Sequence, residues 1–290
     1  MKRTVGDRIF DTVNVIFLTF FAFLCLFPFI NIIAVSLSDN SAIISGKVFL
    51  WPVGINTAAY KEVFTDLSML RSFGFTVVLT VVYTLITLVM TILCAYPLSK
   101  KQLKGRTAFL LIIAFTMYFS SGSIPIYLLV SELKLLNTIW ALILPGAVNT
   151  FNMIVMKSFF TSIPAGLEES AKIDGAGHFR ILFSIVLPLS MPIIATISLF
   201  YAVGRWNGFS DAIYYINDPK MFPLQLKLRQ LISLNNVDQM MTDLQAEQER
   251  IIPEQIKSAS IMFATVPILL VYPWLQKYFV KGMMVGSIKG

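Results

Sequence analysis

Few side chains in this 290-residue chain could carry out chemistry, and three of them lie close together between Ser162 and Pro192. Glu169, Asp174 and His178, the only histidine, could act as acids or bases if a partner oriented them. No second His or Cys lies near His178 in the sequence, which argues against a zinc site. No orienting partner for a catalytic base is evident either. A membrane enzyme built on these three residues is our least favoured hypothesis, and we expect a solvent-facing loop.

The stretch begins with signals for a helix. Ser162 can cap the first turn, and Pro164 suits that turn because proline has no amide hydrogen to leave unpaired. Glu168 and Glu169 follow near the positive end of the helix dipole. Glu168 also stands four residues before Lys172, carboxylate first, which adds a little support. We therefore predict a short helix capped by Ser162.

A glycine then predicts a sharp corner in the chain. Gly175 follows Asp174 where a helix would close in a left-handed residue. A second short helix is expected from Ala176 to Phe183, and it leads into an apolar run that Pro188 and Pro192 interrupt. Helix, glycine corner and helix together predict a compact docking element.

Seven residues of this stretch have a spacing that a known family shares. They are Glu169, Ser170, Ala171, Gly175, Ile185, Leu187 and Pro188, with Asp174 beside the glycine. This pattern resembles the cytoplasmic loop of the permease subunits of ABC importers, which reads Glu-Ala-Ala, three residues, Gly, nine residues, Ile, one residue, Leu-Pro. The single departure is Ser170, a small residue where the family usually has alanine. The resemblance implies that these residues couple the membrane part to a separate ATPase.

Six apolar runs are each long enough to cross a hydrocarbon core of about 30 Å, which takes roughly 20 helical residues. They cover residues 13–37, 72–98, 107–130, 138–156, 181–204 and 258–276. Since 56% of the residues are hydrophobic and only 13% are charged, we predict an all-α membrane protein with six transmembrane helices. The resemblance implies a five-helix importer permease core, spans two to six, plus an additional N-terminal span.

None of the six runs contains Asp, Glu, Lys, Arg or His. An ionisable group at mid-bilayer costs about 2.5–3.5 kcal/mol on the insertion scale, so proteins that keep one there usually need it for function. Its absence argues against coupling to an ion gradient. The chain also lacks the GxxxxGK[ST] phosphate loop, so any ATPase must be a separate subunit. A secondary transporter or a facilitator channel working without ATP is the alternative.

The distribution of positive charge predicts the orientation. With the N-terminus inside, the cytoplasmic side receives thirteen Lys and Arg against five Asp and Glu, and the other side receives ten against eleven. We therefore expect a multi-pass protein of the bacterial cytoplasmic membrane with the loop and both termini in the cytoplasm. Because the membrane orientation explains the excess of Lys and Arg over Asp and Glu, nucleic-acid binding is not indicated.

Polar residues in the third and fourth runs are candidates for a translocation path. The segment from Ser120 to Pro125 frees backbone groups at membrane depth, which is tolerated only against protein or a water-filled path. The candidate residues are Ser120, Ser121, Ser123, Asn149 and Asn152. Hydrogen bonding between helices by small polar side chains is an equally good interpretation.

Other segments extend the resemblance over the chain. Trp206 and Asn207 match a Trp-Asn pair of sugar-type permeases, and residues 272–290 resemble the ends of carbohydrate importer permeases. Residues 238–250 are acidic and favour a helix, either solvated or in contact with a soluble partner. The resemblance implies import of a sugar or oligosaccharide by an assembly with a second permease subunit, two ATPase subunits that bind ATP, and an extracytoplasmic solute-binding protein.

Two parts of the chain are expected. Residues 1–70 would form the N-terminal transmembrane helix and an extracytoplasmic loop. Residues 71–290 would form the permease core in contact with membrane lipid, with a cytoplasmic coupling loop at 157–183 and a cytoplasmic C-terminal tail. No cofactor and no metal is expected in this chain itself.

Overall fold

A computed structural model describes residues 5–119, 121–241 and 252–287. Every regular element among them is helical, and the only β contact there is an isolated bridge between Ser38 and Ile55. This confirms the all-α fold class. By its internal contacts the chain forms two compact units, Met1–Leu70 with Leu228–Val266 and Arg71–Lys227 with Pro267–Gly290.

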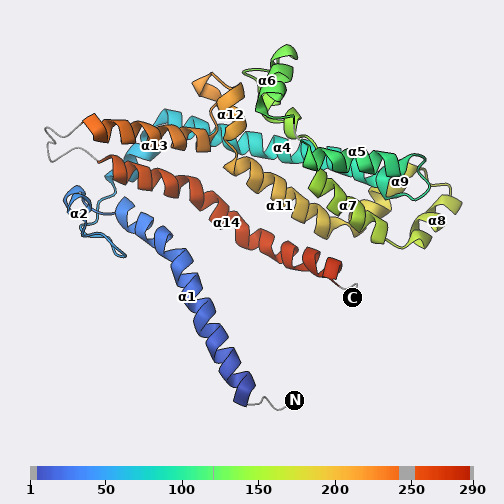
Figure 1. Ribbon diagram of the computed structural model, residues 1–290, viewed down its shortest axis with the longest axis horizontal. Helices are drawn as coiled ribbons and strands as arrows, with labels where there is room; N and C mark the ends of the chain where they lie inside the picture. Colours follow the sequence, from blue (N-terminus) through green and yellow to red (C-terminus); the bar gives the residue numbers. More distant parts are fainter. Residues whose placement is uncertain (1–4, 120, 242–251, 288–290) are drawn as a thin grey trace. The chain divides into compact units, whose positions relative to one another are not determined.

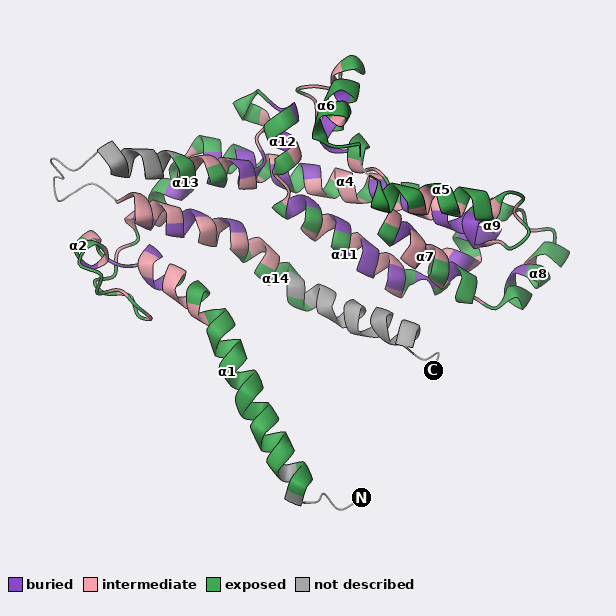
Figure 2. Cartoon of the chain, in the orientation of Figure 1, coloured by how far each residue is buried: buried purple, intermediate pink, exposed green. Residues whose placement is uncertain are grey.

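The first unit contains helix α1 and the loop that follows it. Its helices are α1 (Val5–Ser36), α2 (Asn40–Ile44) and α3 (Ala58–Thr65). Most side chains of α1 are apolar and exposed, as a lipid-facing span requires (Figure 2). Ser38 closes the loop, because its Oγ donates to Ala34 O (2.6 Å) and accepts from Val53 N (3.0 Å). The buried Gln255 donates to Ser38 O from the same unit (2.9 Å).

The second unit contains most of the helices (Figure 1). They are α5 (Arg106–Tyr118), α6 (Ser123–Glu132), η1 (Ile139–Leu142), η2 (Leu144–Gly146), α7 (Thr150–Ser162), α8 (Ala165–Ile173), α9 (His178–Ile181), η3 (Leu182–Val186), α10 (Leu187–Leu189), α11 (Met191–Asn207), α12 (Ser210–Tyr215) and η4 (Pro219–Met221). Three long helices, α4 (Leu67–Ser99), α13 (Leu224–Met241) and α14 (Pro253–Ser287), have residues in both units.

Two hydrophobic clusters form the core of this second unit. One lies among α4, α7, α9 and α11, and its fully buried members include Met153, Met156 and Ile197. The other joins α4, η1 and α12 around Leu79 and Leu142. Tyr83 of α4 packs against both clusters, so α4 is the element that the two cores share.

Among the described residues there are three candidate membrane spans, or up to six if each bent pair of helices counts as one span. Three single helices, Ile9–Ser36, Leu67–Ser99 and Pro253–Val271, are long and apolar enough to cross a membrane. Three pairs qualify only together, and each is bent by more than 40° at a short break: Arg106–Tyr118 with Ser123–Glu132, Ile139–Gly146 with Thr150–Ser162, and His178–Leu189 with Met191–Asn207. Six crossings therefore stay a prediction.

The predicted spans at 107–130, 138–156 and 181–204 are all broken in the structure, and the sequence indicates the breaks in the first and the third. The first breaks after Tyr118, and the second begins with the short 3-10 turns η1 and η2 around Pro145. The third bends by 82° at Ser190, between Pro188 and Pro192. Proline removes an amide donor and clashes with the preceding turn, which accounts for the breaks at Pro145 and between Pro188 and Pro192, whereas α1 and α14 continue through Pro28 and Pro267.

Candidate functional site

The predicted glycine corner is present, and its backbone explains why glycine is needed. Gly175 has φ +79°, in the left-handed region. Its amide donates to Lys172 O (3.0 Å), and the amide of Ala176 donates to Ala171 O (2.9 Å). These two bonds form a Schellman motif, which satisfies the last carbonyls of α8. We call residues Ala165–Ile181 the α8–α9 corner.

The ends of the two helices differ from the prediction. Ser162 does not cap α8. It ends α7, with its hydroxyl donating to Phe159 O (2.7 Å), and Pro164 occupies the cap position of α8. Proline disfavours helical geometry in the residue before it, so Ile163 is extended and separates the helices. The second helix is also shorter than 176–183, because Gly177 is extended and α9 becomes a π-helix at Leu182.

Side chains at the end of α4 and directly after it contact both helices of the corner. Glu168 of α8 is only 9% exposed and forms an ion pair with Lys100, which follows α4, rather than with the predicted Lys172. The Lys100 ammonium lies 4.5 Å from the centre of the Tyr96 ring, and the Tyr96 hydroxyl lies 3.5 Å from His178 O of α9. The corner is therefore fixed on its inner side to one end of a long apolar helix.

The residues of the predicted coupling motif fall into two groups. Glu169, Ser170, Asp174, Gly175 and Pro188 are exposed. Ala171, Ile185 and Leu187 are half-buried, and Ala171 and Leu187 pack against the hydrophobic core. The structure thus divides the motif by burial into residues that are partly covered and residues that are exposed.

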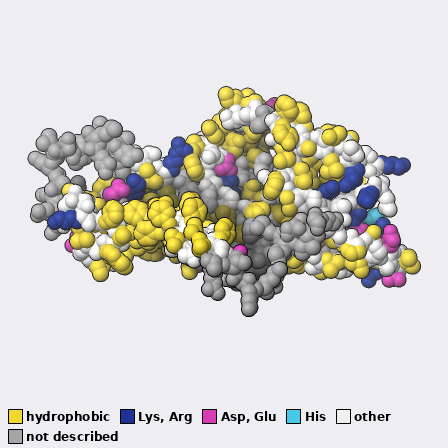
Figure 3. Space-filling model, turned by 60° about the horizontal axis from the view of Figure 1, so that its bottom comes forward, with side chains coloured by type: hydrophobic (Ala, Val, Ile, Leu, Met, Phe, Trp, Pro, Cys, Tyr) yellow, Lys and Arg dark blue, Asp and Glu magenta, His cyan; other side chains and the backbone are white. Residues whose placement is uncertain are grey.

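Exposed apolar side chains on the corner are the feature that the motif did not indicate. Ile173 is 87% exposed and Phe179 is 71% exposed, one on each helix. Figure 3 shows charged side chains gathered at the end of the molecule where α8 and α9 lie. Apolar side chains held outward within a charged surface are typical of a protein-binding site. The available signal was the position of Ile173 and Phe179 directly beside charged residues in the sequence.

The predicted path residues do not form one group. Ser120 lies outside the described residues, and Ser121 and Ser123 are exposed at the break between α5 and α6. Asn149 caps α7 by accepting from Asn152 N (3.0 Å), and Asn152 is buried. No hydrogen bond joins these serines to the asparagines within the described ranges. Asn149 therefore has a structural role, and a path along these residues stays a prediction.

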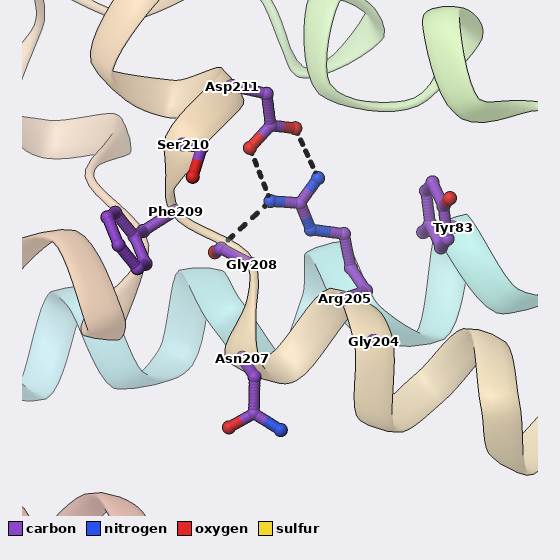
Figure 4. Close-up of a pocket in the computed structure, with 8 residues that line it drawn as sticks. All are labelled: Tyr83, Gly204, Arg205, Asn207, Gly208, Phe209, Ser210 and Asp211. Atoms are coloured by element: carbon purple, nitrogen blue, oxygen red, sulfur yellow. Dashed lines mark hydrogen bonds and ion pairs between the residues drawn. The ribbon is translucent and has the colours of Figure 1, made fainter.

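A buried ion pair at the end of α11 was not predicted. Arg205 is 6% exposed, and its two terminal nitrogens bind the two oxygens of Asp211 at 2.5 and 2.9 Å (Figure 4). The same nitrogens donate to Leu142 O and Gly208 O (both 3.2 Å). The sequence placed Arg205 one residue beyond an apolar run, but α11 continues through Asn207.

Gly208 allows this pair to form. A Cβ atom at Gly208 would lie 2.9 Å from an Arg205 nitrogen and 3.2 Å from the Gly204 carbonyl, closer than side chains tolerate. The neighbouring Trp206 is buried against Phe73 of α4, with ring centres 5.9 Å apart. Trp206 therefore packs α11 against α4. The turn at Gly208 places the following residues beside Arg205.

The Arg205 cluster continues along α4. Its guanidinium lies 5.7 Å from the Tyr83 ring centre, and Tyr83 packs edge-on against Tyr201. The Tyr201 hydroxyl is 2.6 Å from Thr91 Oγ1 and accepts from Asn149 N (3.3 Å). Because Asp211 balances the charge of Arg205 at short range, the pair does not have the unpaired carboxylate of a proton relay.

Two further predictions fall partly outside the described residues. The acidic segment 238–250 is described only to Met241, where α13 ends. The C-terminal segment 272–290 is helical to Ser287 and lies outside the described residues beyond that point. Among the described residues, no three His, Cys, Asp or Glu side chains gather where they could hold a metal ion.

Comparison with known proteins gives consistent matches over the chain. A family model described as "Binding-protein-dependent transport system inner membrane component" matches residues 87–285. Protein LplC of Bacillus subtilis (strain 168) is 47% identical over 291 residues, covering 100% of this chain and 98% of that protein. The polygalacturonan/rhamnogalacturonan transport system permease protein YtcP of the same organism is 45% identical over 286 residues, covering 98% and 99%. A crystal structure of a bacterial ABC transporter that imports the acidic polysaccharide alginate contains a chain with a TM-score of 0.87 and 36% identity, covering 96% and 99%.

Proposed function

Since the chain belongs to the family of binding-protein-dependent transport system inner membrane components, we propose that it moves a sugar or oligosaccharide into the cytoplasm as the permease subunit of an ABC importer. Support comes from YtcP, whose name assigns it to polysaccharide transport, and from the transporter involved in alginate import. The apolar single helices supply the membrane part of such a subunit. The chain is a transport subunit, and ATP is bound by partner ATPases.

The α8–α9 corner is the contact with the ATPase in this proposal. Its inner side is tied to α4 through Glu168, Lys100 and Tyr96, and its outer side presents Ile173 and Phe179. A displacement of the corner would therefore be transmitted to α4, which both hydrophobic clusters share. The outward apolar side chains on this anchored corner are the observation that carries the proposal.

The proposed assembly contains four kinds of subunit. This chain pairs with a second permease, two ATPases bind at the corners, and a solute-binding protein delivers sugar from outside. The family description, which names binding-protein dependence, supports the last partner. The α8–α9 corner and both termini then face the cytoplasm, in agreement with the excess of Lys and Arg in the loops on that side.

Substitution of the outward apolar residues tests the ATPase contact. Ile173→Asp and Phe179→Asp should leave the subunit in the membrane, since both side chains are exposed, but should abolish co-purification of the ATPase and ATP-driven uptake. Ile213→Asp, at an exposed apolar residue of α12, is the matched control and should retain the ATPase. Normal ATPase recovery in both corner variants would contradict the proposed contact. Sugar uptake by the reconstituted chain without any ATPase would favour a facilitator instead.

A further inference from the structure

A pocket beside the Arg205–Asp211 pair lies at a distance from the α8–α9 corner. Its volume is about 320 Å³, and small-molecule sites typically have roughly 300–1,000 Å³. The lining residues are Tyr83, Gly204, Arg205, Asn207, Gly208, Phe209, Ser210 and Asp211. Tyr83 and Tyr96 are thirteen residues apart on α4, which corresponds to about 20 Å along a helix. The pocket therefore lies well away from the end that binds the ATPase in our proposal.

Arg205 has no terminal hydrogen left for a ligand. Each of its two terminal nitrogens carries two hydrogens, and each makes two hydrogen bonds, to Asp211 and to Leu142 O or Gly208 O. The remaining Nε is buried from solvent and has no partner. The guanidinium therefore forms a wall of the pocket and orients Asp211, and it cannot clamp a carboxylate without losing bonds that it already makes.

Asp211 is the accessible member of the pair. Its side chain is 31% exposed, against 6% for Arg205. Oδ1 accepts from Arg205 and from Ala212 N (3.0 Å), whereas Oδ2 accepts from Arg205 alone. A carboxylate can accept about four hydrogen bonds, so Oδ2 retains capacity for a donor. The pocket thus presents a hydrogen-bond acceptor whose charge is already balanced.

Two neighbouring side chains add to this hydrogen-bonding surface. Ser210 is exposed, and its hydroxyl can donate or accept. Asn207 is exposed and uses its amide nitrogen to bind Val203 O (3.0 Å), which leaves its carbonyl oxygen as an acceptor. Phe209 supplies an apolar wall. In Figure 4, Ser210 lies beside the ion pair and Asn207 on the other side of the Gly208 turn.

These properties select among three classes of ligand. An anionic sugar would meet the Asp211 carboxylate and an arginine without a free terminal donor. A cation would find the charge of Asp211 already balanced by Arg205. A neutral polyol supplies hydroxyl donors to Asp211 and Asn207 and an apolar ring face, and it brings no charge that would need a partner.

We propose that this pocket is a subsite for a neutral, hydroxyl-bearing sugar unit, with Asp211 as the acceptor and Arg205 as the residue that positions it. The inference rests on the proposed function as a sugar importer subunit. It specifies the chemical class of the sugar unit that binds in this pocket. A substrate that also carries carboxylates would have them bound elsewhere in the assembly.

Protection of a cysteine introduced by Ser210→Cys from a thiol reagent tests the proposal in the assembled importer. Cys25 and Cys94 are replaced first, so that Ser210→Cys carries the only thiol in the chain. The probes are panels of neutral trisaccharides, including galactotriose, and of uronate trisaccharides, including trigalacturonate. We expect neutral sugars to slow labelling about tenfold at ten times their Kd, as occupancy requires, and uronates to leave it unchanged. Ser158→Cys, exposed on α7 outside the pocket, should be labelled at the same rate with every sugar.

Two outcomes would overturn the inference. Protection by uronates without protection by neutral sugars would assign the pocket to acidic units, and no protection by either panel would show that it is not a sugar subsite. ATPase stimulation by the loaded solute-binding protein is measured in the importer with Ser210 intact. If this stimulation is present while the pocket stays unprotected, only the subsite is wrong; if it is absent, the proposed function fails.

A second variant tests the role of charge in the pocket. Asp211→Asn, combined with Ser210→Cys, keeps an acceptor but leaves the charge of Arg205 without its counter-charge, so uronates should now protect the introduced thiol to a degree that approaches the neutral sugars. Unchanged discrimination in an inserted Asp211→Asn protein would contradict the role of Asp211. If this variant fails to insert because Arg205 loses its counter-charge, the result with Ser210→Cys alone decides the proposal.

Discussion

A side chain at Gly175 should weaken ATPase binding without affecting insertion. The residue has φ +79°, and a Cβ atom there would meet no other atom within 4 Å. Steric conflict with neighbours is therefore absent, and the whole cost is backbone strain, about 1–2 kcal/mol for a left-handed residue with a side chain. If the closed corner is the form that binds, this shift lowers its population relative to open forms by a factor of roughly 5–30.

The assay is the apparent affinity of the purified ATPase for the subunit in membranes, together with ATP-driven sugar uptake. Gly175→Val should lower both, with a loss of affinity in the range given above. Gly175→Asn should lose less, because asparagine tolerates the left-handed region better. Gly177→Ala is the matched control, since Gly177 has φ −72° and equally open surroundings.

Two results would refute this reasoning. Equal affinity of Gly175→Val and wild type would mean that the corner binds in a form that does not need the left-handed residue. An equal loss in Gly175→Asn and Gly175→Val, with Gly177→Ala unaffected, would mean that side-chain bulk at the contact matters and backbone strain does not.

Three other predictions concern the anchoring pair, the path and the orientation. Lys100→Met or Glu168→Gln should lower the free energy of unfolding by about 1–3 kcal/mol, measured by thermal unfolding. This is less than the full cost of breaking a buried pair, because Lys100 is partly exposed. Lys100→Met combined with Glu168→Leu should recover most of the loss. Ser121→Leu combined with Ser123→Leu should reduce uptake in a properly inserted protein if these serines line a wet path, and unchanged uptake would remove them from it. Lys101→Cys should resist a membrane-impermeant reagent in intact cells and react in inverted vesicles; labelling from outside would reverse the topology.

Features set by neighbouring residues could be predicted from the sequence. The left-handed conformation of Gly175 follows from an amphipathic helix that ends in a glycine, and the apolar helices follow from composition. The interruption at Pro188 and Pro192 was predicted because proline acts on its own backbone and the preceding turn, and the break at Pro145 could have been inferred in the same way. Composition outweighed this signal in the predicted span at 138–156.

Features that depend on distant residues could not be predicted in this way. Glu168 has a possible partner four residues away in Lys172, but it pairs with Lys100, brought near by the packing of α8 on the end of α4. Arg205 and Asp211 are close in sequence, yet their pairing needs the Gly208 turn and the carbonyl of Leu142. A hydropathy average over 20 residues predicts that such a charged residue is exposed to solvent. In the folded chain the residue is buried and paired with groups from other segments.

The π-helix at Leu182–Val186 affects which length changes the protein can tolerate. Each hydrogen-bonded ring of a π-helix holds one residue more than a ring of an α-helix, so the segment takes up an extra residue as a local bulge. Deleting one residue inside the π-helix should convert the segment to an ordinary α-helix. The direction of the Phe179 side chain should not change. The same deletion within α11, before Arg205, would rotate the following residues by about 100° and carry Arg205 away from the Leu142 carbonyl and the Tyr83 ring. A single-residue deletion introduced into this chain is therefore expected to be tolerated at Leu182–Val186 and not within α11.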